Sequence, residues 1–335
     1  GRLNVRIENC KFYDGVADAI SIYINVDIVI KNCIMKDVFR GGIVIGGGNS
    51  KVDVQNVKIF GENLSTGIDI EVEESAKGYR GSIAVDVTMK NVELDSDLDI
   101  GFSGGSTFYG ENIKLNSPPF RIFAHNSKVY LKNSEFTTGF AANCFINLPG
   151  EVIFDNCLFI VKPGKYPDTK SLKKEYDLAA FKINWYKQKR KGVNQLVHLK
   201  NSKILFQNAP GTYNKSYSII SNFSPKRDNN LVLIENTQVV GEFDSFINIR
   251  NGGNINIKSS EIESASIFKI SNYSNEVKIN VHNLKTILGP SKLFKFKKTS
   301  LNSLEFVNSI NKYKGKYSQE IENGFNIYNL ETTLK

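Results

Sequence analysis

The chain of 335 residues is 41% hydrophobic and holds only 8 prolines, a composition that excludes a disordered protein. No run of about 18 apolar residues occurs, so the sequence predicts no membrane insertion. The net charge of +9 suits an anionic polysaccharide, a nucleic acid or an anionic lipid as partner, although a solvated lysine-rich face also accounts for it.

An asparagine followed by a small or apolar residue recurs along the chain and closes a short alternating run each time. The first intervals are 23 and 24 residues, and later ones are 21 and 23. A period of this size is typical of stacked coils, each of which buries its apolar face only against its neighbours. We interpret these asparagines as structural, because Asn tolerates the left-handed conformation and stacked amides can form a ladder. They are Asn9, Asn32, Asn56, Asn91, Asn112, Asn133, Asn156, Asn201, Asn236 and Asn308.

Each repeat contains two runs that alternate between apolar and polar residues and are rich in Val and Ile. The run that ends at the asparagine occurs at 26–32, 51–56, 128–133 and 151–156. A second run lies about ten residues upstream, at 19–23, 42–46, 67–71, 99–103, 120–124, 181–185, 246–250 and 268–272. Alternation with period two predicts strands with one buried face.

The fold predicted from these repeats is all-β. A leucine-rich repeat has a similar period, but it needs a helix in every repeat, and helical spacing is absent here. We therefore predict a single-stranded right-handed parallel β-helix of about 11–12 coils of roughly 21–25 residues. The right hand follows from the rule for parallel crossover connections.

The predicted β-helix covers residues 1–312, and 313–335 forms a C-terminal cap or an oligomer contact. Two longer intervals, of 35 and 45 residues, place loop insertions near 72–82 and 161–179. The chain opens inside a repeat without a signal peptide, so we expect residue 1 to lie within a longer protein.

The four cysteines lie at positions 10, 33, 144 and 157, and three of them share one place in the repeat. This pattern is typical of stacked small buried residues, and less so of a disulfide framework or a metal site. The three histidines are dispersed. We therefore predict no metal site and no cofactor.

Asp69 and Glu71 form the clearest candidate for chemistry. Because Ile68 and Ile70 face the core, the two carboxylates point outward together, roughly 6.5–7 Å apart along the strand. Their repulsion raises the pKa of one of them, so that one carboxyl can act as an acid and the other as a base or nucleophile. The alternative is an acidic pair on a solvated strand without a function.

Small residues are expected beside this acidic pair. Aligning the runs places Val44 and Gly46 on one side, and Gly101 and Ser103 on the other. The pair would then lie on the floor of a shallow groove with room for a ligand.

Charged and aromatic residues surround the predicted groove. Asp99 is expected at the turn before its strand, where it offers an alternative carboxylate. Trp185, the only tryptophan, is either a platform for a sugar ring or a lid over the flank of the stack, and His125 at its turn can also be a surface residue without a role. The catalytic candidates are Asp69, Glu71 and Asp99. The substrate-binding candidates are Asp18, Tyr23, Arg40, Tyr79, Arg80, Arg121, His125 and Trp185.

Four segments within residues 3–160 carry a family resemblance: D-A-I-S-I at 18–22, D-I-V-I-K-N-C at 27–33, R-G-G-I-V-I at 40–45 and G-I-D-I-E at 67–71. Their succession resembles the pectate-lyase-like β-helix proteins of phages and prophages. Ala19 and Val72 depart from the Gly and Pro usual in that family, and the calcium-binding acidic cluster of pectate lyases is not evident. The resemblance carries over to Asp18, Arg40, Asp69 and Glu71.

That family includes tail-spike and tail-fibre depolymerases that cleave bacterial surface polysaccharides, usually as trimers. The resemblance implies a phage tail-spike-like hydrolase that acts on an acidic bacterial polysaccharide with paired carboxylates. The open alternatives are a lyase that uses Arg121 with Tyr79 or His125, a non-catalytic carbohydrate-binding β-helix, and a structural shaft. We expect a homotrimer on a virion tail or at a cell surface, with no nucleic-acid partner.

Overall fold

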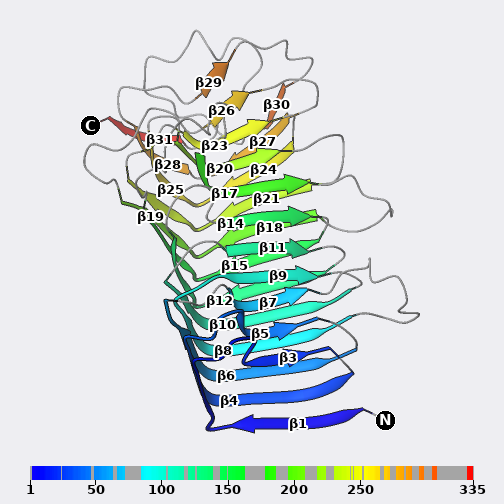
Figure 1. The fold of residues 1–335 in the computed structure, drawn as a ribbon. Coiled ribbons are helices and arrows are strands. Elements are labelled where there is room, and N and C mark those ends of the chain that lie inside the picture. The colour runs from blue at the N-terminus through cyan, green and yellow to red at the C-terminus, as the bar shows by residue number, and fades with distance from the viewer. Residues whose placement is uncertain are drawn as a thin grey trace. The chain divides into compact units, whose positions relative to one another are not determined.

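The protein, in a computed structural model, consists of β-strands joined by loops (Figure 1). The structure describes residues 2–334 except 24, 47–48, 63–65, 72–83, 103–104, 117–119, 125–126, 139–143, 149, 163–177, 186–194, 208–216, 224–229, 242, 244, 251–252, 265–267, 272–276, 283, 289–293, 298–303 and 308–329. Across these described residues the chain is all-β, and no helix is long and apolar enough to cross a membrane.

The chain divides into two compact units. The first comprises Gly1–Gly139 with Asn143–Leu158, and the second comprises Phe140–Ala142 with Phe159–Lys335. Each unit is built from the same two kinds of strand that the sequence predicts, which lie on two different sheets. The candidate residues, apart from Trp185, belong to the first unit.

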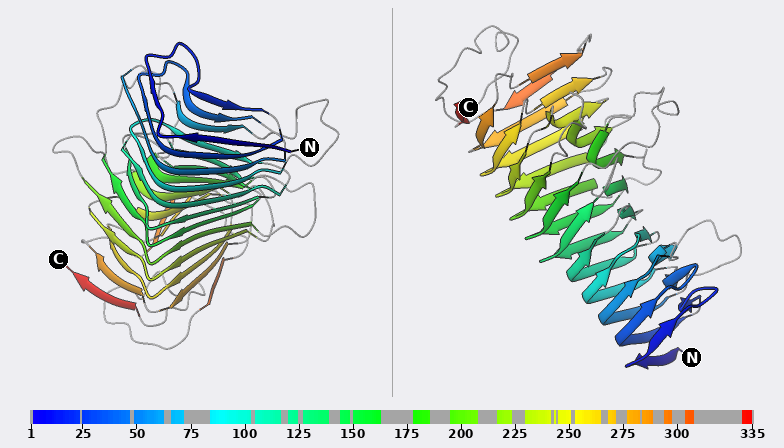
Figure 2. Two further views of the ribbon diagram at one scale, coloured as in Figure 1. Left: turned by 90° about the horizontal axis from the view of Figure 1, so that it is seen from below. Right: turned by 60° about the vertical axis from the view of Figure 1, so that its left-hand side comes forward.

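The first unit contains two sets of strands, which Figure 2 shows from two sides. The strands that precede, contain or follow the repeated asparagines are β1 (Leu3–Glu8), β2 (Lys11–Tyr13), β4 (Val26–Lys36), β6 (Lys51–Phe60), β8 (Asp86–Leu94), β10 (Thr107–Leu115), β12 (Lys128–Lys132), β13 (Glu135–Thr138) and β15 (Glu151–Asp155). The strands of the upstream run are β3 (Ile20–Ile22), β5 (Gly41–Ile45), β7 (Thr66–Glu71), β9 (Leu98–Phe102), β11 (Phe120–Ala124) and β14 (Cys144–Leu148).

Neighbouring strands of this unit run parallel and in register. Ile28 of β4 pairs with Val52 of β6, and Ile43 of β5 pairs with Ile68 of β7. Equivalent residues therefore stack in columns, about 4.8 Å apart. This parallel pairing is what the period of the asparagines predicts.

The core of the first unit lies between its two sheets. The ring of Phe120 in β11 stacks on Phe136 of β13, with ring centroids 5.0 Å apart, and meets Phe154 of β15 edge-on at 6.3 Å. All three side chains are fully buried. A buried Phe contributes about 2–3 kcal/mol through its removal from water, so aromatic contacts between sheets stabilise the stack.

The repeated asparagines form the ladder that the sequence predicts. Nine of them, from Asn9 to Asn236, have φ between 46° and 56°. Their amides bond along the stack: Asn32 donates to Asn9 at 3.1 Å, Asn56 to Asn32 at 3.0 Å and Asn91 to Asn56 at 2.9 Å. At the equivalent position Ser259 also has a positive φ, of 45°, which the asparagine pattern alone does not reveal.

We expect Asn56→Ala to lower the free energy of unfolding by about 2 kcal/mol, because Ala is strained at positive φ and the ladder loses two amide hydrogen bonds. Asn56→Gly is the matched control, since Gly removes the same bonds but tolerates φ of 53°. Urea unfolding should rank wild type, Gly and Ala in falling order of stability. Equal losses for both variants would assign the effect to the ladder alone.

The second unit repeats the pattern with its own strands. Those on the same sheet as the strands next to the repeated asparagines are β18 (Gln195–Lys200), β19 (Lys203–Phe206), β21 (Asn230–Glu235), β22 (Gln238–Val240), β24 (Gly253–Lys258), β25 (Glu261–Ser264), β27 (Val277–His282), β28 (Leu284–Leu288), β30 (Leu304–Val307) and β31 (Leu330–Leu334). Those on the other sheet are β17 (Leu178–Trp185), β20 (Tyr217–Phe223), β23 (Ser245–Arg250), β26 (Phe268–Ser271) and β29 (Phe294–Lys297). β16 (Leu158–Val161) lies at the sequence boundary between the units.

The strands expected at 120–124, 181–185, 246–250 and 268–272 correspond to β11, β17, β23 and β26. The first predicted insertion lies outside the described residues, as does most of the second, although Val161 ends β16 and Leu178 begins β17. Within 313–335 the structure describes only β31.

Candidate functional site

The candidate site lies on the outer face of β5, β7, β9 and β11, which neighbour one another in the second sheet of the first unit (Figure 1). In β7, Ile68 and Ile70 are buried, whereas Asp69 is half-buried and Glu71 is exposed. The two carboxylates therefore point outward together, as the alternation predicts. Val44 of β5 flanks Asp69 on one side, also as predicted.

The predicted neighbours on the other side are wrong by two residues. Asp69 pairs with Asp99, and Glu71 pairs with Gly101. Asp99 thus lies within β9 rather than at the turn before it. The strand begins at Leu98, and its apolar residues Leu98 and Ile100 are buried, so the alternation holds and only the register with β7 differs from the prediction. The expected partner Ser103 lies outside the described residues.

Arg121 of β11 binds Asp99 through two hydrogen bonds. Its Nε donates to Oδ1 of Asp99 at 2.6 Å, and its Nη2 donates to Oδ2. The guanidinium is 42% exposed, whereas the Asp99 side chain is only 14% exposed. This two-fold contact is the strong form of the arginine–carboxylate pair, and it raises the pKa of Arg121. The pair fixes the side chains across β9 and β11.

Asp69 keeps its proton near neutral pH. Burial, the charges of Glu71 and Asp99, and a hydrogen bond with Glu71 raise its pKa from 3.8 to about 7, although Arg121 opposes this shift. Desolvation and like charges both disfavour the ionised form of a carboxyl. Asp69 can therefore give up a proton at neutral pH, which an ordinary aspartate on a strand surface cannot.

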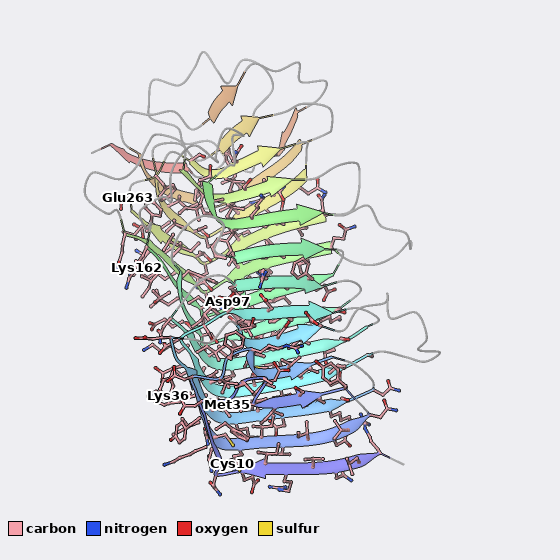
Figure 3. All side chains as sticks on the ribbon, viewed as in Figure 1. Cys10, Met35, Lys36, Asp97, Lys162 and Glu263 are labelled. Atoms are coloured by element: carbon pink, nitrogen blue, oxygen red, sulfur yellow. The ribbon has the colours of Figure 1, made fainter. Side chains whose placement is uncertain are left out.

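Asp97 is a site residue that the sequence reading missed. Burial and the neighbouring Asp99 raise its pKa to about 6, and its Oδ2 is 3.8 Å from Nη2 of Arg121. Its carbonyl accepts hydrogen bonds from the N–H groups of Gly67 and Ile68, which anchors the turn beside β7. Figure 3 labels Asp97 among the side chains of the sheet. The signal in the sequence is the closely spaced acids at 95, 97 and 99.

Two more candidates, Asp18 and Arg40, form a second cluster with Ser21 of β3. Ser21 of β3 donates to Oδ2 of Asp18 at 2.9 Å, and Nε of Arg40 lies 3.5 Å from Oδ1 of Asp18. The Asp18 side chain is only 6% exposed, whereas Arg40 is largely exposed. Asp18 thus holds Ser21 and Arg40 on the outer face. Ser21 lies in the column of Val44 and Asp69.

Tyr23 follows β3 and is 47% exposed. Its ring occupies the space beside the backbone of Gly46, where a Cβ would lie 2.1 Å from the ring. Gly46 therefore makes room for the ring of Tyr23, whereas the sequence predicts room for a ligand at this position. Ile45 of β5 pairs with Ile70 of β7, so the residues that follow them, Gly46 and Glu71, are neighbours. The ring of Tyr23 therefore lies beside the position adjacent to Glu71.

Tyr79, Arg80 and His125 lie outside the described residues. Trp185 is the last residue of β17 in the second unit, but its side chain is likewise not described. The structure therefore brings together Asp69, Glu71, Asp99 and Arg121, and separately Asp18 with Arg40.

The described residues contain no group of three or more His, Cys, Asp or Glu side chains arranged to hold a metal ion. The arrangement can instead move a proton, because Asp69 and Glu71 share a hydrogen bond while Arg121 holds the third carboxylate, Asp99. No protein-family model matches this chain, and no curated protein matches it in sequence.

Proposed function

We propose that the protein hydrolyses a polysaccharide, and that Asp69 and Glu71 are its acid and base. The observation that carries this proposal is the half-buried Asp69 between the exposed Glu71 on its own strand and Asp99 on the next, a placement that raises the pKa of Asp69 to about 7. Two carboxyl groups in environments that separate their pKa values are the usual means of cleaving a glycosidic bond. The expected substrate is a bacterial surface polysaccharide, in keeping with the family resemblance of the sequence.

We further propose that the strands close into a right-handed parallel β-helix of about 11–12 coils. Parallel register within each unit and aromatic contacts between the sheets of the first unit support it. In such a solenoid the second sheet is one long face, so a polymer can contact several coils at once.

In the proposed mechanism Asp69 donates its proton to the glycosidic oxygen, and Glu71 accepts a proton from the attacking water. The Cα atoms of residues i and i+2 of a strand lie about 6.6 Å apart, so the two carboxyl groups can take up the wider separation found in inverting glycosidases once substrate parts them. Substrate that enters between them replaces the hydrogen bond that joins Asp69 and Glu71. Asp99 positions Arg121 and leaves the base to Glu71, because both of its oxygens accept from the guanidinium.

The same geometry favours hydrolysis over elimination. A lyase needs a cation that neutralises the carboxylate of a uronate. Arg121 already contacts Asp99 and Asp97, so its charge is largely taken up by the protein. The predicted lyase partners Tyr79 and His125 lie outside the described residues.

The test of the function is incubation with a panel of bacterial capsular and exopolysaccharides, following polymer size together with the ultraviolet absorbance of unsaturated uronates. Shortening without new absorbance supports hydrolysis by Asp69 and Glu71. Shortening with new absorbance would assign the site to a lyase, and binding without shortening to a carbohydrate-binding protein.

Tyr23 is proposed to contact the sugar next to the cleaved bond. On a polymer that the wild type shortens, we expect Tyr23→Ala to raise KM about tenfold with little change in kcat, because aromatic contacts contribute about 1–2 kcal/mol to binding. Gly46→Ala should have a similar effect, since its Cβ displaces the ring. Tyr23→Phe keeps the ring and serves as the control. A wild-type KM in both Tyr23→Ala and Gly46→Ala would remove Tyr23 from the site.

The assembly and location remain part of the proposal. The resemblance of the sequence favours a homotrimer on a virion tail or at a cell surface. Light scattering in solution tests the trimer directly, because its mass is three times the 37.6 kDa of the chain.

A further inference from the structure

Cys10 and Cys33 occupy the same place on successive turns of the first unit. Lys11 pairs with Ile34 one residue further along, so the two cysteines are neighbours across adjacent parallel strands. The N–H of Ile34 donates to the carbonyl of Cys10 at 3.0 Å. Neighbouring strands lie about 4.8 Å apart, which falls within the Cα separations of disulfides. If the Cβ atoms share the strand spacing, they need to approach by about 1 Å to reach the mean Cβ separation of disulfides.

The Cys33 thiol lies between its own strand and the earlier turn. Its Sγ is 3.2 Å from the carbonyl oxygen of Lys31 and 3.6 Å from that of Ile7, and it contacts both the main chain and the side chain of Cys10. Both cysteines are free thiols in this structure. Cys33 is 1% exposed, whereas Cys10, labelled in Figure 3, is only partly buried, so an oxidant in solution reaches Cys10 first.

We propose that Cys10 and Cys33 form a disulfide when the protein meets a small-molecule disulfide such as glutathione disulfide. The Cys10 thiolate attacks one sulfur of glutathione disulfide, which forms a mixed disulfide and releases one glutathione thiolate. The Cys33 thiolate then attacks Sγ of Cys10, forms the protein disulfide and releases the second glutathione. Two protein thiols are oxidised, one glutathione disulfide is reduced to two glutathione molecules, and the two thiol protons pass to the released thiolates or to water.

The bond would fasten the first turn of the stack to the second. A disulfide between positions 10 and 33 closes a loop that contains β2 and β3 and restricts its opening. In an oxidising compartment the first turn would therefore be covalently held.

Cys157 is an internal control. It lies in the same place of a later turn, is 2% exposed, and bonds to the main chain of Ser134, which replaces a cysteine on the turn before it. It therefore has no thiol neighbour in its column within the first unit. Burial raises the pKa of its thiol to about 12, which further protects it from exchange.

The test is incubation of the folded chain with glutathione disulfide at pH 8, followed by alkylation, proteolysis without reductant and mass spectrometry. We expect a peptide pair joined between Cys10 and Cys33, while Cys157 is alkylated only after unfolding. The joined chain should resist proteolysis within residues 3–36 about tenfold longer than the reduced chain. Cys10→Ser and Cys33→Ser should each abolish both effects, and Cys157→Ser should abolish neither.

Three results would overturn the proposal: a stable glutathione adduct on Cys10 that never resolves, unreacted thiols at both positions, or a bond only between separate chains. A Cys33→Ser chain that fails to fold is replaced by Cys10→Ser, because Cys10 is the more exposed of the two. None of these three results depends on whether the protein cleaves a polysaccharide.

Discussion

We expect Asp69→Asn to lower the rate of the proposed polysaccharide cleavage by about 10³-fold, because a general acid is lost. The amide keeps the size of the side chain but has no proton to donate to the glycosidic oxygen. The rate is measured as new reducing ends released from a polymer that the wild type shortens. Glu71→Gln should cause a loss of similar size, because the attacking water loses its base.

The same substitution is expected to stabilise the fold at alkaline pH. The pKa of Asp69 is raised from 3.8 to about 7, so its contribution to stability is full below pH 3.8 and is lost as the pH rises through 7. The shift corresponds to about 4 kcal/mol, which solvent screening of a half-buried group reduces to about 1–2 kcal/mol. Urea unfolding should therefore show Asp69→Asn to be more stable than the wild type at pH 8 and nearly equal to it at pH 4.

Asp53→Asn is the matched control, because Asp53 is a half-buried aspartate on β6, on the other sheet. It should leave the cleavage rate unchanged. The wild-type rate should itself fall about tenfold per pH unit above pH 7, since only protonated Asp69 donates. Full activity in Asp69→Asn at any pH would remove Asp69 from the mechanism.

The strands and the asparagine ladder could be predicted from the sequence because each depends on local chemistry. Alternation at 51–54 identifies the buried face of β6, and the left-handed conformation of Asn56 follows from the tolerance of asparagine for positive φ. The period of about 23 residues then implies parallel stacking. Both features repeat, so an error in one coil is corrected by the next.

The site was only partly predictable because it depends on the register between neighbouring strands of the sheet. The outward direction of Asp69 and Glu71 follows from their own strand, but their neighbours depend on where β9 begins. Alternation is unchanged by a shift of two residues, so it cannot distinguish Gly101 from Asp99 as the neighbour of Asp69. The contact of Asp99 with Arg121, which changes its role from base to anchor, becomes visible only in the structure.

Arg121→Ala should destabilise the first unit by about 2 kcal/mol at pH 8, because it leaves the acids around it without a cation. The loss is smaller than the 3–5 kcal/mol typical of fully buried pairs, since the guanidinium is 42% exposed. At pH 5 the loss should shrink, because Asp69 and Asp97, with pKa values of about 7 and 6, then carry protons. Urea unfolding at the two pH values measures both effects.

Arg121→Ala also removes the charge that lowers the pKa of Asp69, so the pH above which cleavage falls should move upward from 7. Arg121→Lys keeps the charge but not the two-fold contact with Asp99, and it separates electrostatics from positioning. If Lys restores the pH profile but not the rate, Arg121 positions the site through Asp99.

A double variant with Asp99→Asn should lose less stability than the two single losses combined, because the two side chains interact directly. If the stability losses of the two single variants simply add in the double variant, the contact between Arg121 and Asp99 does not hold the site together.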